Sequence, residues 1–239
     1  MAESRIEWTT YTWNCWYGCT KVSDACDRCY AETWGRRSGL VPKWDTPPRL
    51  ASSATRKAPL KWNQLAQGLR PRVFTLSLGD FFDNQAEPEW RADAWAIIRE
   101  CRNLDWLILT KRPQNIRKML PPDWGDGYPQ VWLGTTTENC KEASRRIRHL
   151  LAIPAKVHWL SAEPLLEPLE LRCHLAPSGQ HGINWVVGGG ETGGNERYSN
   201  PDWFRDLRDQ CRTTGAAYFM KQMTKKAEIP PDLLIREYP

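Results

Sequence analysis

The chain has 239 residues, of which 41% are hydrophobic and 26% charged, and its 33 Lys and Arg against 28 Asp and Glu give a net charge of +5. This length can bury a substantial core and no linker-like stretch divides it, so we expect a single domain over residues 1–239. It has no run of eighteen apolar residues and no charged-then-apolar leader, which predicts a cytoplasmic protein without a membrane partner.

The first informative feature along the chain is a loop at residues 13–30 that contains Cys19, Cys26 and Cys29. Two cysteines separated by two residues can bind one ion or cluster, and a third can reach the same metal through a loop. Clustered thiols in a reducing compartment bind metal more often than they form disulfides. Three thiolates hold three irons of a four-iron cluster and leave the fourth open, whereas structural zinc normally takes four protein ligands. The spacing therefore favours an iron–sulfur cluster.

Cys15 keeps a second metal site open. With it the pattern becomes Cys-x3-Cys-x6-Cys-x2-Cys, which a closed tetrahedral zinc site can use. Cys140 and Cys173 are scattered singly, and so are Cys101 and Cys211, which fall on apolar helix faces where we expect buried thiols.

An irregular excursion is expected over residues 34–70, which are rich in Pro and Ser. Residues 71–222 then alternate between short apolar runs and helical patterns, and each run ends in a polar or glycine-containing turn. The apolar runs indicate buried parallel strands. They span residues 73–78, 106–109, 131–133, 156–160, 183–187 and 216–220.

Helices are predicted between these strands. Apolar residues at helical spacing indicate one helix from Trp90 to Cys101 and another from Ala143 to Leu151. The clearest helix has Asn200 as N-cap and Gly215 just past its end. Strand and helix repeated at intervals of about 25 to 35 residues predict an α/β fold, a partial or full parallel (β/α) barrel of about six to seven units.

Active sites in such folds lie at the carboxyl ends of the strands. Loop starts are polar in any protein, but three consecutive glycines would also let a ligand approach the backbone closely. The chain has no phosphate-binding loop and no G-x-G-x-x-G, so triphosphate and dinucleotide binding are poorly supported. The candidate residues at the strand ends are Ser77, Asp80, Thr110, Lys111, Thr135, Thr136, Thr137, Ser161, Glu163, Gly188, Gly189, Gly190 and Glu191.

Basic groups are a second functional signal. Solvated helix faces often carry such groups, but they can also track a phosphate backbone. They are Arg36-Arg37, Lys111-Arg112, Arg145-Arg146-x-Arg148 and Lys225-Lys226. Two alternative functions follow from the residues alone. One is a zinc-stabilised nucleic-acid-binding module without catalysis. The other is a barrel hydrolase in which Glu163 and Glu191 form the pair of carboxyl groups.

Six motifs are spread over nearly the whole chain: Ile6-Glu7-Trp8-Thr9, Trp13-Asn14, the cysteine loop Gly18–Tyr30, Leu109-Thr110-Lys111-Arg112-Pro113, Leu160-Ser161-Ala162-Glu163-Pro164-Leu165 and Val187-Gly188-Gly189-Gly190-Glu191. Together they resemble an uncharacterised phage-associated family, a domain of unknown function whose three-cysteine motif is similar to the radical SAM signature. The chain departs from that signature because six residues rather than three separate its first two cysteines. Cys15 and Cys19 are themselves three residues apart, so a triad that includes Cys15 stays open.

The resemblance implies a radical-SAM-like partial barrel with a 4Fe-4S cluster held by Cys19, Cys26 and Cys29. The cluster would cleave S-adenosylmethionine reductively to a deoxyadenosyl radical, which abstracts hydrogen from the substrate. Such an enzyme needs an electron donor protein. The frequent genomic neighbour of the family resembles a methyltransferase, which implies a methyltransferase-like partner. DNA or RNA would suit a barrel with a basic rim, and peptide and small-metabolite substrates stay open.

If the chain binds S-adenosylmethionine, the strand-end positions predict contacts for each part of it. Ser77 and Asp80 are assigned to the methionine amino end, 135–137 to the ribose hydroxyls and 188–190 to the adenosine. Substrate or cofactor polar groups would meet three further side chains, namely Glu163, Glu191 and Lys111. Three further residues are also predicted to bind the cofactor, namely Tyr30, Thr110 and Ser161.

Overall fold

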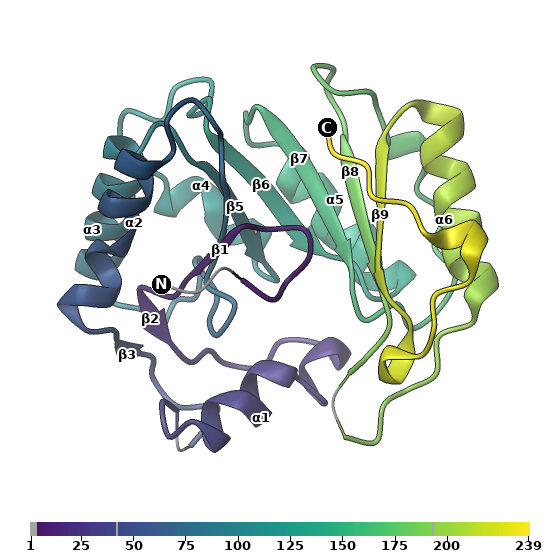
Figure 1. The fold of residues 1–239 in the computed structure, drawn as a ribbon, viewed down its shortest axis with the longest axis horizontal. Helices are drawn as coiled ribbons and strands as arrows, with labels where there is room; N and C mark the ends of the chain where they lie inside the picture. Colours follow the sequence, from purple (N-terminus) through teal and green to yellow (C-terminus); the bar gives the residue numbers. More distant parts are fainter. Residues whose placement is uncertain (1–3, 42, 193) are drawn as a thin grey trace. The chain divides into compact units, whose positions relative to one another are not determined.

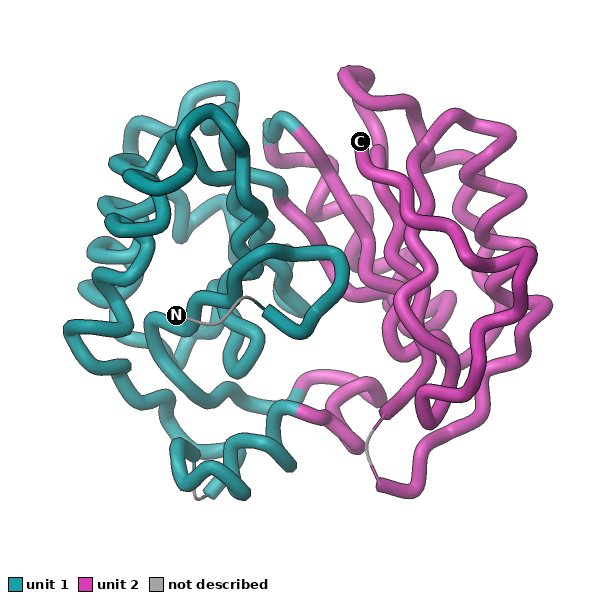
Figure 2. Tube along the Cα trace, viewed as in Figure 1, with its two compact units in different colours: residues 1–21, 31–132, 154–156 teal, residues 22–30, 133–153, 157–239 magenta. Residues whose placement is uncertain are grey.

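The computed structural model describes residues 4–41, 43–192 and 194–239. The chain forms two compact units, which Figure 2 shows in different colours. The first unit comprises residues 1–21, 31–132 and 154–156, and the second comprises residues 22–30, 133–153 and 157–239.

Three parallel strands form the sheet of the first unit. Strand β4 (Arg72–Thr75) pairs with β1 (Tyr11–Trp13) on one side and with β5 (Asp105–Thr110) on the other. A two-stranded antiparallel ribbon, β2 (Trp16–Tyr17) with β3 (Arg49–Leu50), lies between β1 and β4 in the sequence. The pattern analysis did not predict β1, because its three residues are too few to show an alternation.

Four helices follow in the first part of the chain: α1 (Tyr30–Arg37), α2 (Ser53–Leu65), α3 (Pro88–Glu100) and α4 (Ile116–Met119). Helix α2 falls within residues 34–70, where an irregular excursion was predicted. Its N-cap Ser52 accepts a hydrogen bond from the Thr55 amide at 3.2 Å, and it buries Ala58, Pro59 and Trp62 against the unit. A proline inside the helix conceals its periodicity in the sequence.

The second unit contains β7 (Val157–Ala162), β8 (Trp185–Gly189) and β9 (Ala217–Gln222), which pair in parallel. Its helices are α5 (Cys140–Leu151) and α6 (Pro201–Thr214). Strand β6 (Val131–Thr136) supplies its first two residues to the first unit and the others to the second. Short 3-10 helices lie at Asp24–Cys26, Pro113–Asn115, Arg172–His174, Thr224–Lys226 and Pro231–Leu233.

The strand order is β1-β4-β5-β6-β7-β8-β9, with helices in the connections between strands (Figure 1). The order runs along the chain without reversal, whereas a doubly wound sheet reverses at a switch point. This topology confirms the predicted parallel β/α fold of the partial-barrel type, with seven strands in its sheet.

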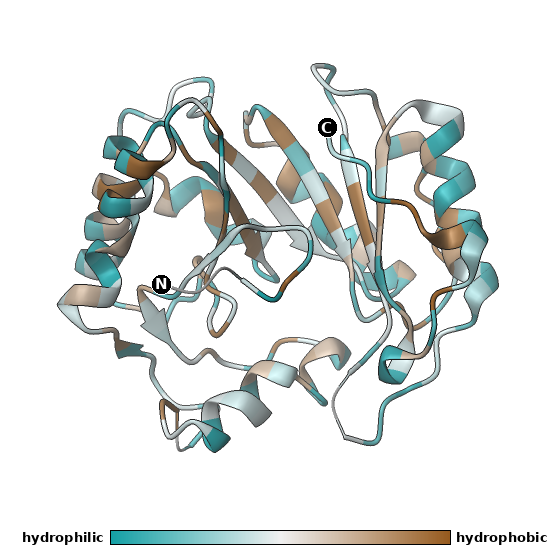
Figure 3. Cartoon of the chain, in the orientation of Figure 1, coloured by the Kyte–Doolittle hydropathy of each residue, from teal (hydrophilic) through white to brown (hydrophobic). Residues whose placement is uncertain are grey.

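Along the sheet strands, brown hydrophobic segments alternate with paler ones in Figure 3, and most residues of these strands are buried. The six predicted strands all exist, with ends that differ by at most three residues. Helix α6 has its predicted caps, since the Asn200 side chain accepts from the Asp202 amide at 2.9 Å and Gly215 adopts φ 77°. Within the described residues, no helix combines the length and apolar character that a membrane span requires.

Candidate functional site

The cysteine loop contributes residues to both units. Cys19 belongs to the first unit, where it is half-buried, and Cys26 and Cys29 belong to the second. Cys26 is buried at the end of a 3-10 turn, and half-buried Cys29 directly precedes α1. None of these thiols forms a disulfide. In the part of the chain that the structure describes, no three His, Cys, Asp or Glu side chains form a ready-made metal site.

In the first unit, Arg112 ties the cysteine loop to the carboxyl ends of β4 and β5. Its Nη2 donates to the carbonyl oxygen of Thr20 at 2.7 Å, directly after Cys19. Two buried carboxylates hold the guanidinium, Asp80 at 3.0 Å and Asp83 at 3.2 Å. The Thr20 amide donates to Asp83 at 3.1 Å, so both the amide and the carbonyl oxygen of Thr20 are hydrogen-bonded to this network. Burial alone would lower the pKa of Arg112, but the two carboxylates outweigh it and raise that pKa.

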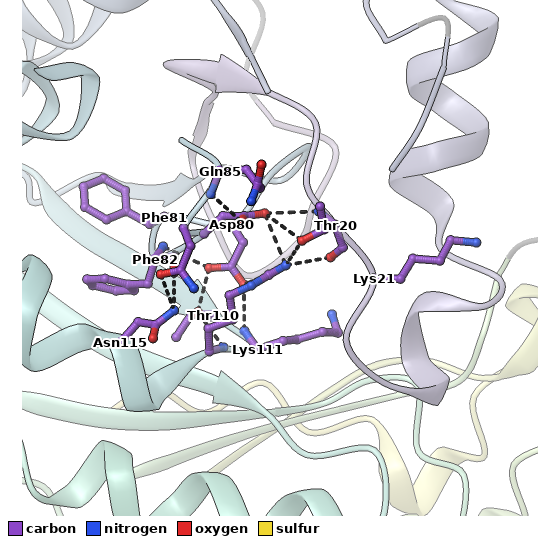
Figure 4. A network of polar contacts seen from close by, with 12 residues as sticks. Thr20, Lys21, Asp80, Phe81, Phe82, Gln85, Thr110, Lys111 and Asn115 are labelled. Atoms are coloured by element: carbon purple, nitrogen blue, oxygen red, sulfur yellow. Dashed lines mark hydrogen bonds and ion pairs between the residues drawn. The ribbon is translucent and has the colours of Figure 1, made fainter. Parts of the chain in front are cut away.

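Asp80 lies at the centre of this network, which Figure 4 shows with Thr20, Thr110 and Lys111. Its Oδ1 accepts from the Thr110 hydroxyl at 2.6 Å, and its Oδ2 accepts from the Lys111 amide at 3.0 Å and from Arg112. The carboxylate is 5% exposed. This geometry favours a role in holding Arg112 and the loop over the predicted contact with the methionine amino group.

In the second unit, Arg146 of α5 binds the next part of the cysteine loop. Its side chain is fully buried, and its Nη2 donates to the Ser23 hydroxyl at 2.9 Å. Glu138 and Glu142 hold the guanidinium at 2.7 Å and 2.9 Å. Nη1 also donates to the carbonyl oxygen of Thr136 at the end of β6, again at 2.9 Å. The loop is thereby attached to the carboxyl end of β6.

A third arginine, Arg197, follows β8. It donates from Nη2 to the carbonyl oxygen of Asp24 at 2.8 Å. Glu191, 5% exposed, accepts from Arg197 Nη2 at 2.6 Å and from its backbone amide at 2.8 Å. The hydrogen bond with Glu191 raises the pKa of Arg197. Glu191 was predicted as a catalytic group, but in the structure it anchors the arginine that binds the loop.

These three arginines were not singled out as site residues by the sequence. We call them the loop arginines: Arg112, Arg146 and Arg197. Two of them belong to basic groups that were candidates for phosphate contacts, yet Arg112 and Arg146 are buried and ion-paired. The sequence signal that could have revealed Arg146 is Glu142 four residues earlier on the same helix, a spacing that allows ion pairing.

A separate polar cluster joins the ends of β7 and β9. Glu163 Oε1 forms an ion pair with Lys221 and accepts from Gln222 Nε2 at 3.0 Å. Gln222 also donates to the Gly190 carbonyl oxygen at 3.0 Å, which connects this cluster to the end of β8. Glu163 and Lys221 have side chains that are 15% and 16% exposed. The structure thus brings together the predicted Glu163 and two strand-end residues that had no assigned role.

The three glycines at the end of β8, Gly188, Gly189 and Gly190, pack closely against other parts of the protein. A Cβ on Gly188 would lie 2.7 Å from the Tyr218 hydroxyl, and one on Gly190 would lie 2.2 Å from the Thr224 backbone nitrogen. For Gly189 the neighbour is the carboxyl group of Glu163 at 3.1 Å. A ligand was predicted to approach these glycines; in the direction that a Cβ would take, their neighbours are other parts of the chain.

The remaining predicted residues occupy several environments. The three threonines at residues 135–137 are buried, and the hydroxyls of Thr136 and Thr137 have no hydrogen-bond partner among the described residues. Ser161 is buried and its carbonyl oxygen accepts from the Thr137 amide at 2.9 Å. Ser77 accepts from the Asn14 amide group at 3.1 Å, and Tyr30 is 42% exposed at the start of α1.

Cys15 differs from the three loop cysteines. It is 2% exposed in the core of the first unit, and burial raises the pKa of its thiol far above the usual value. A metal ligand must be a thiolate, so this environment disfavours ligation by Cys15. The set Cys19, Cys26 and Cys29 fits the chemistry of a four-iron cluster, since three thiols outside any disulfide meet its need for sulfur ligands and leave one iron open.

The model of a family of proteins of unknown function (DUF5131) matches residues 3–230. Among solved structures, the fold is similar to spore photoproduct lyase complexed with dinucleoside spore photoproduct, at 9% identity and a TM-score of 0.48, over 88% of this chain and 75% of that one. A variant of that lyase with bound AdoMet and the same dinucleoside gives 10% identity and a TM-score of 0.46, over 90% and 77%. No curated protein matches the chain. Likeness this remote supports no conclusion about activity.

Proposed function

The chain belongs to the DUF5131 family of proteins of unknown function, and from its own residues we propose that it is an iron–sulfur enzyme of the radical SAM type. In this proposal Cys19, Cys26 and Cys29 hold a 4Fe-4S cluster. When bound, the cluster supplies an electron to S-adenosylmethionine, which cleaves to methionine and a deoxyadenosyl radical that takes hydrogen from the substrate. The proposal therefore includes an electron donor protein as a partner.

The attachment of the cysteine loop to strand ends is the observation that best supports this proposal. Gly18 donates to the Leu78 carbonyl oxygen at 2.7 Å, and the three loop arginines bind residues 20, 23 and 24 from positions after β5, β6 and β8. Parallel β/α folds keep their active sites at the carboxyl ends of the strands. The cysteines therefore belong to the edge of the sheet where chemistry is expected, rather than to a remote structural clip.

Other residues at this edge have the chemistry that a polar cofactor needs. The hydroxyls of Thr136 and Thr137 are buried without partners among the described residues, which suits them to the hydroxyls of a ribose. Glu163 receives both of its donors on Oε1, so Oε2 is available to a charged amine. Lys221 beside it can contact a carboxylate. These groups would orient the cofactor and substrate and exclude water from them.

The hydrolase alternative is not favoured by the geometry. A glycoside hydrolase needs one carboxylic acid that can protonate the leaving group. Glu163 is ion-paired with Lys221, and buried Glu191 is ion-paired with half-buried Arg197. Each carboxylate is thus engaged by its own cation, and Glu191 in addition supports the cysteine loop through that arginine.

The test is the iron and sulfide content of protein reconstituted without oxygen. We expect about four irons and four sulfides per chain, with a broad absorption band near 400 nm. Cys26→Ala should abolish this content, while the matched variant Cys140→Ala, an exposed thiol outside the loop, should leave it intact. One tightly bound zinc per chain in colourless protein would overturn the proposal.

For the substrate we propose nucleic acid, DNA or RNA, as the first class to test. Tyr30 and Trp34 lie one helical turn apart on α1, directly after Cys29, and are 42% and 50% exposed. Exposed aromatic side chains stack on unpaired bases, at about 1–3 kcal/mol per base. Trp34→Ala should therefore weaken binding of a labelled single strand about tenfold. Leu69→Ala, at an exposed apolar residue elsewhere, serves as the control. Equal binding by both variants would remove nucleic acid from the proposal.

A further inference from the structure

The three loop arginines make the same kinds of contact. Each donates to the segment between Cys19 and Cys26, at residues 20, 23 and 24, and each is itself fixed by a buried carboxylate. We propose that Arg146 is a positioning residue for the iron–sulfur cluster, because it sets the conformation of the cysteine loop before the cluster is loaded. This inference rests on the proposed function for the identity of the metal group, but its structural part concerns the loop alone.

The carboxylates make the arginines effective supports. Arg146 binds Glu138, Glu142 and the Thr136 carbonyl oxygen. These contacts hold its side chain in one rotamer independently of its hydrogen bond to Ser23. A guanidinium that is already held in one geometry loses little further entropy when it donates one more hydrogen bond. Hydrogen bonds from a charged donor are also stronger than neutral ones. The arginine can therefore impose its geometry on the loop.

The length of the loop makes such a support necessary. Six residues separate Cys19 from Cys26, and each additional residue in a flexible segment adds conformations that would be lost when a cluster binds. Within the loop, the described backbone contacts include the turn hydrogen bonds of Cys26 with Ser23 and of Asp27 with Asp24. Side chains from elsewhere in the fold supply the other restraints.

Ser23 is the point where this support can be removed most cleanly. Its hydroxyl contacts Arg146, and it makes no capping hydrogen bond to the 3-10 turn that follows it. Ser23→Ala therefore deletes one contact of Arg146 and leaves the buried ion pairs with Glu138 and Glu142 in place. Val22→Ala is the matched control, since Val22 is the neighbouring residue and its side chain is exposed.

The experiment compares hydrogen exchange of the amides of residues 20–29 in the full-length metal-free chain. Ser23→Ala should speed this exchange about tenfold, as expected for the loss of one hydrogen bond to a charged group. The melting temperature should stay close to that of the parent chain, because the ion pairs of Arg146 remain. Val22→Ala should exchange at the parent rate.

A second measurement uses the reconstituted protein and follows release of iron to a chelator. We expect Ser23→Ala to lose iron about tenfold faster than Val22→Ala, because the loop of the variant rearranges more easily. Arg146→Lys supplies an independent variant: it keeps the positive charge but lacks the fork that bridges Glu138 and Ser23. We expect it to lose iron as fast as Ser23→Ala.

The outcomes separate this inference from the proposed function. Exchange and iron release that are the same in Ser23→Ala, Val22→Ala and the parent chain would overturn the inference even if the cluster is present. Faster exchange in Ser23→Ala of a chain that never binds iron would support the loop restraint and overturn the proposed function instead.

Discussion

At the scale of single residues, burial separates Cys15 from Cys19 and Cys29 of the loop. Spacing alone allowed Cys15 to be a fourth ligand, because spacing says nothing about where a side chain points. In the structure its thiol lies in the core of the first unit, 2% exposed, and its pKa is raised by that burial. Half-buried Cys19 and Cys29 are more accessible to an incoming metal.

Cys15→Ala should therefore retain the full iron and sulfide content of the reconstituted protein. The change removes a buried sulfur, and we expect a loss of about 1 kcal/mol in the free energy of unfolding from the small cavity. Metal analysis and urea denaturation measure the two effects. A large loss of iron at unchanged stability would show that Cys15 is a ligand.

Some residues of the candidate site could not be predicted from the sequence. Cysteine spacing and polar strand ends identified the loop and the edge of the sheet, because both follow from local patterns. The loop arginines could not be found in this way, because their roles depend on partners distant in the sequence. The hydrogen-bond partners of Arg112, Arg146 and Arg197 in the loop are 92, 123 and 173 residues away, respectively. A basic group in a sequence gives no sign of whether it is buried.

At the scale of elements, the end of β8 shows how packing can explain a motif that suggested a ligand. Three glycines in a row suggested space for a cofactor. A Cβ at these positions would meet Tyr218, Glu163 and Thr224, so the glycines allow the end of β8 to lie close to its neighbours. Long, regular elements such as α6 were predictable with their caps, whereas α2 was concealed by its internal proline.

Gly190→Ala should consequently destabilise the protein. Its new Cβ would lie 2.2 Å from the Thr224 nitrogen, and backbone atoms cannot move aside as a flexible side chain can. We expect a loss of about 1–3 kcal/mol in the free energy of unfolding, as for other overpacked sites. Gly194→Ala is the control, because its Cβ would have no described atom within 4 Å. Equal stability of the two variants in urea would contradict this account.

At the scale of the whole molecule, the parallel β/α topology was predictable because its apolar runs and helical patterns recur along the chain. The division into two units was not, because the sequence has no linker and β6 supplies residues to both units. A boundary inside a strand leaves no composition change for a sequence pattern to detect.

A dependence of global stability on pH follows from His158 of β7. It is 4% exposed, and burial lowers its pKa below the usual 6.5 while its Nε2 lies 2.8 Å from the Ile153 carbonyl oxygen. The folded protein keeps this histidine neutral, whereas the unfolded chain binds a proton near pH 6.5. Its contribution to stability is therefore present above pH 6.5 and is lost as the pH falls below it.

Urea denaturation between pH 5 and 8 measures this effect. We expect the free energy of unfolding to fall as the solution is acidified through this range, and His158→Gln should flatten the slope, because glutamine can donate to Ile153 without titrating. An identical slope in the parent chain and the variant would assign the pH dependence to other groups.

The loop arginines also set the order in which the protein can be made. Cys19, Cys26 and Cys29 emerge from the ribosome before the three loop arginines, of which Arg197 comes last. A nascent chain that contains the cysteines but not yet the loop arginines lacks the side chains that restrain the cysteine loop. The full set of restraints on the loop therefore exists only after Arg197 has been synthesised.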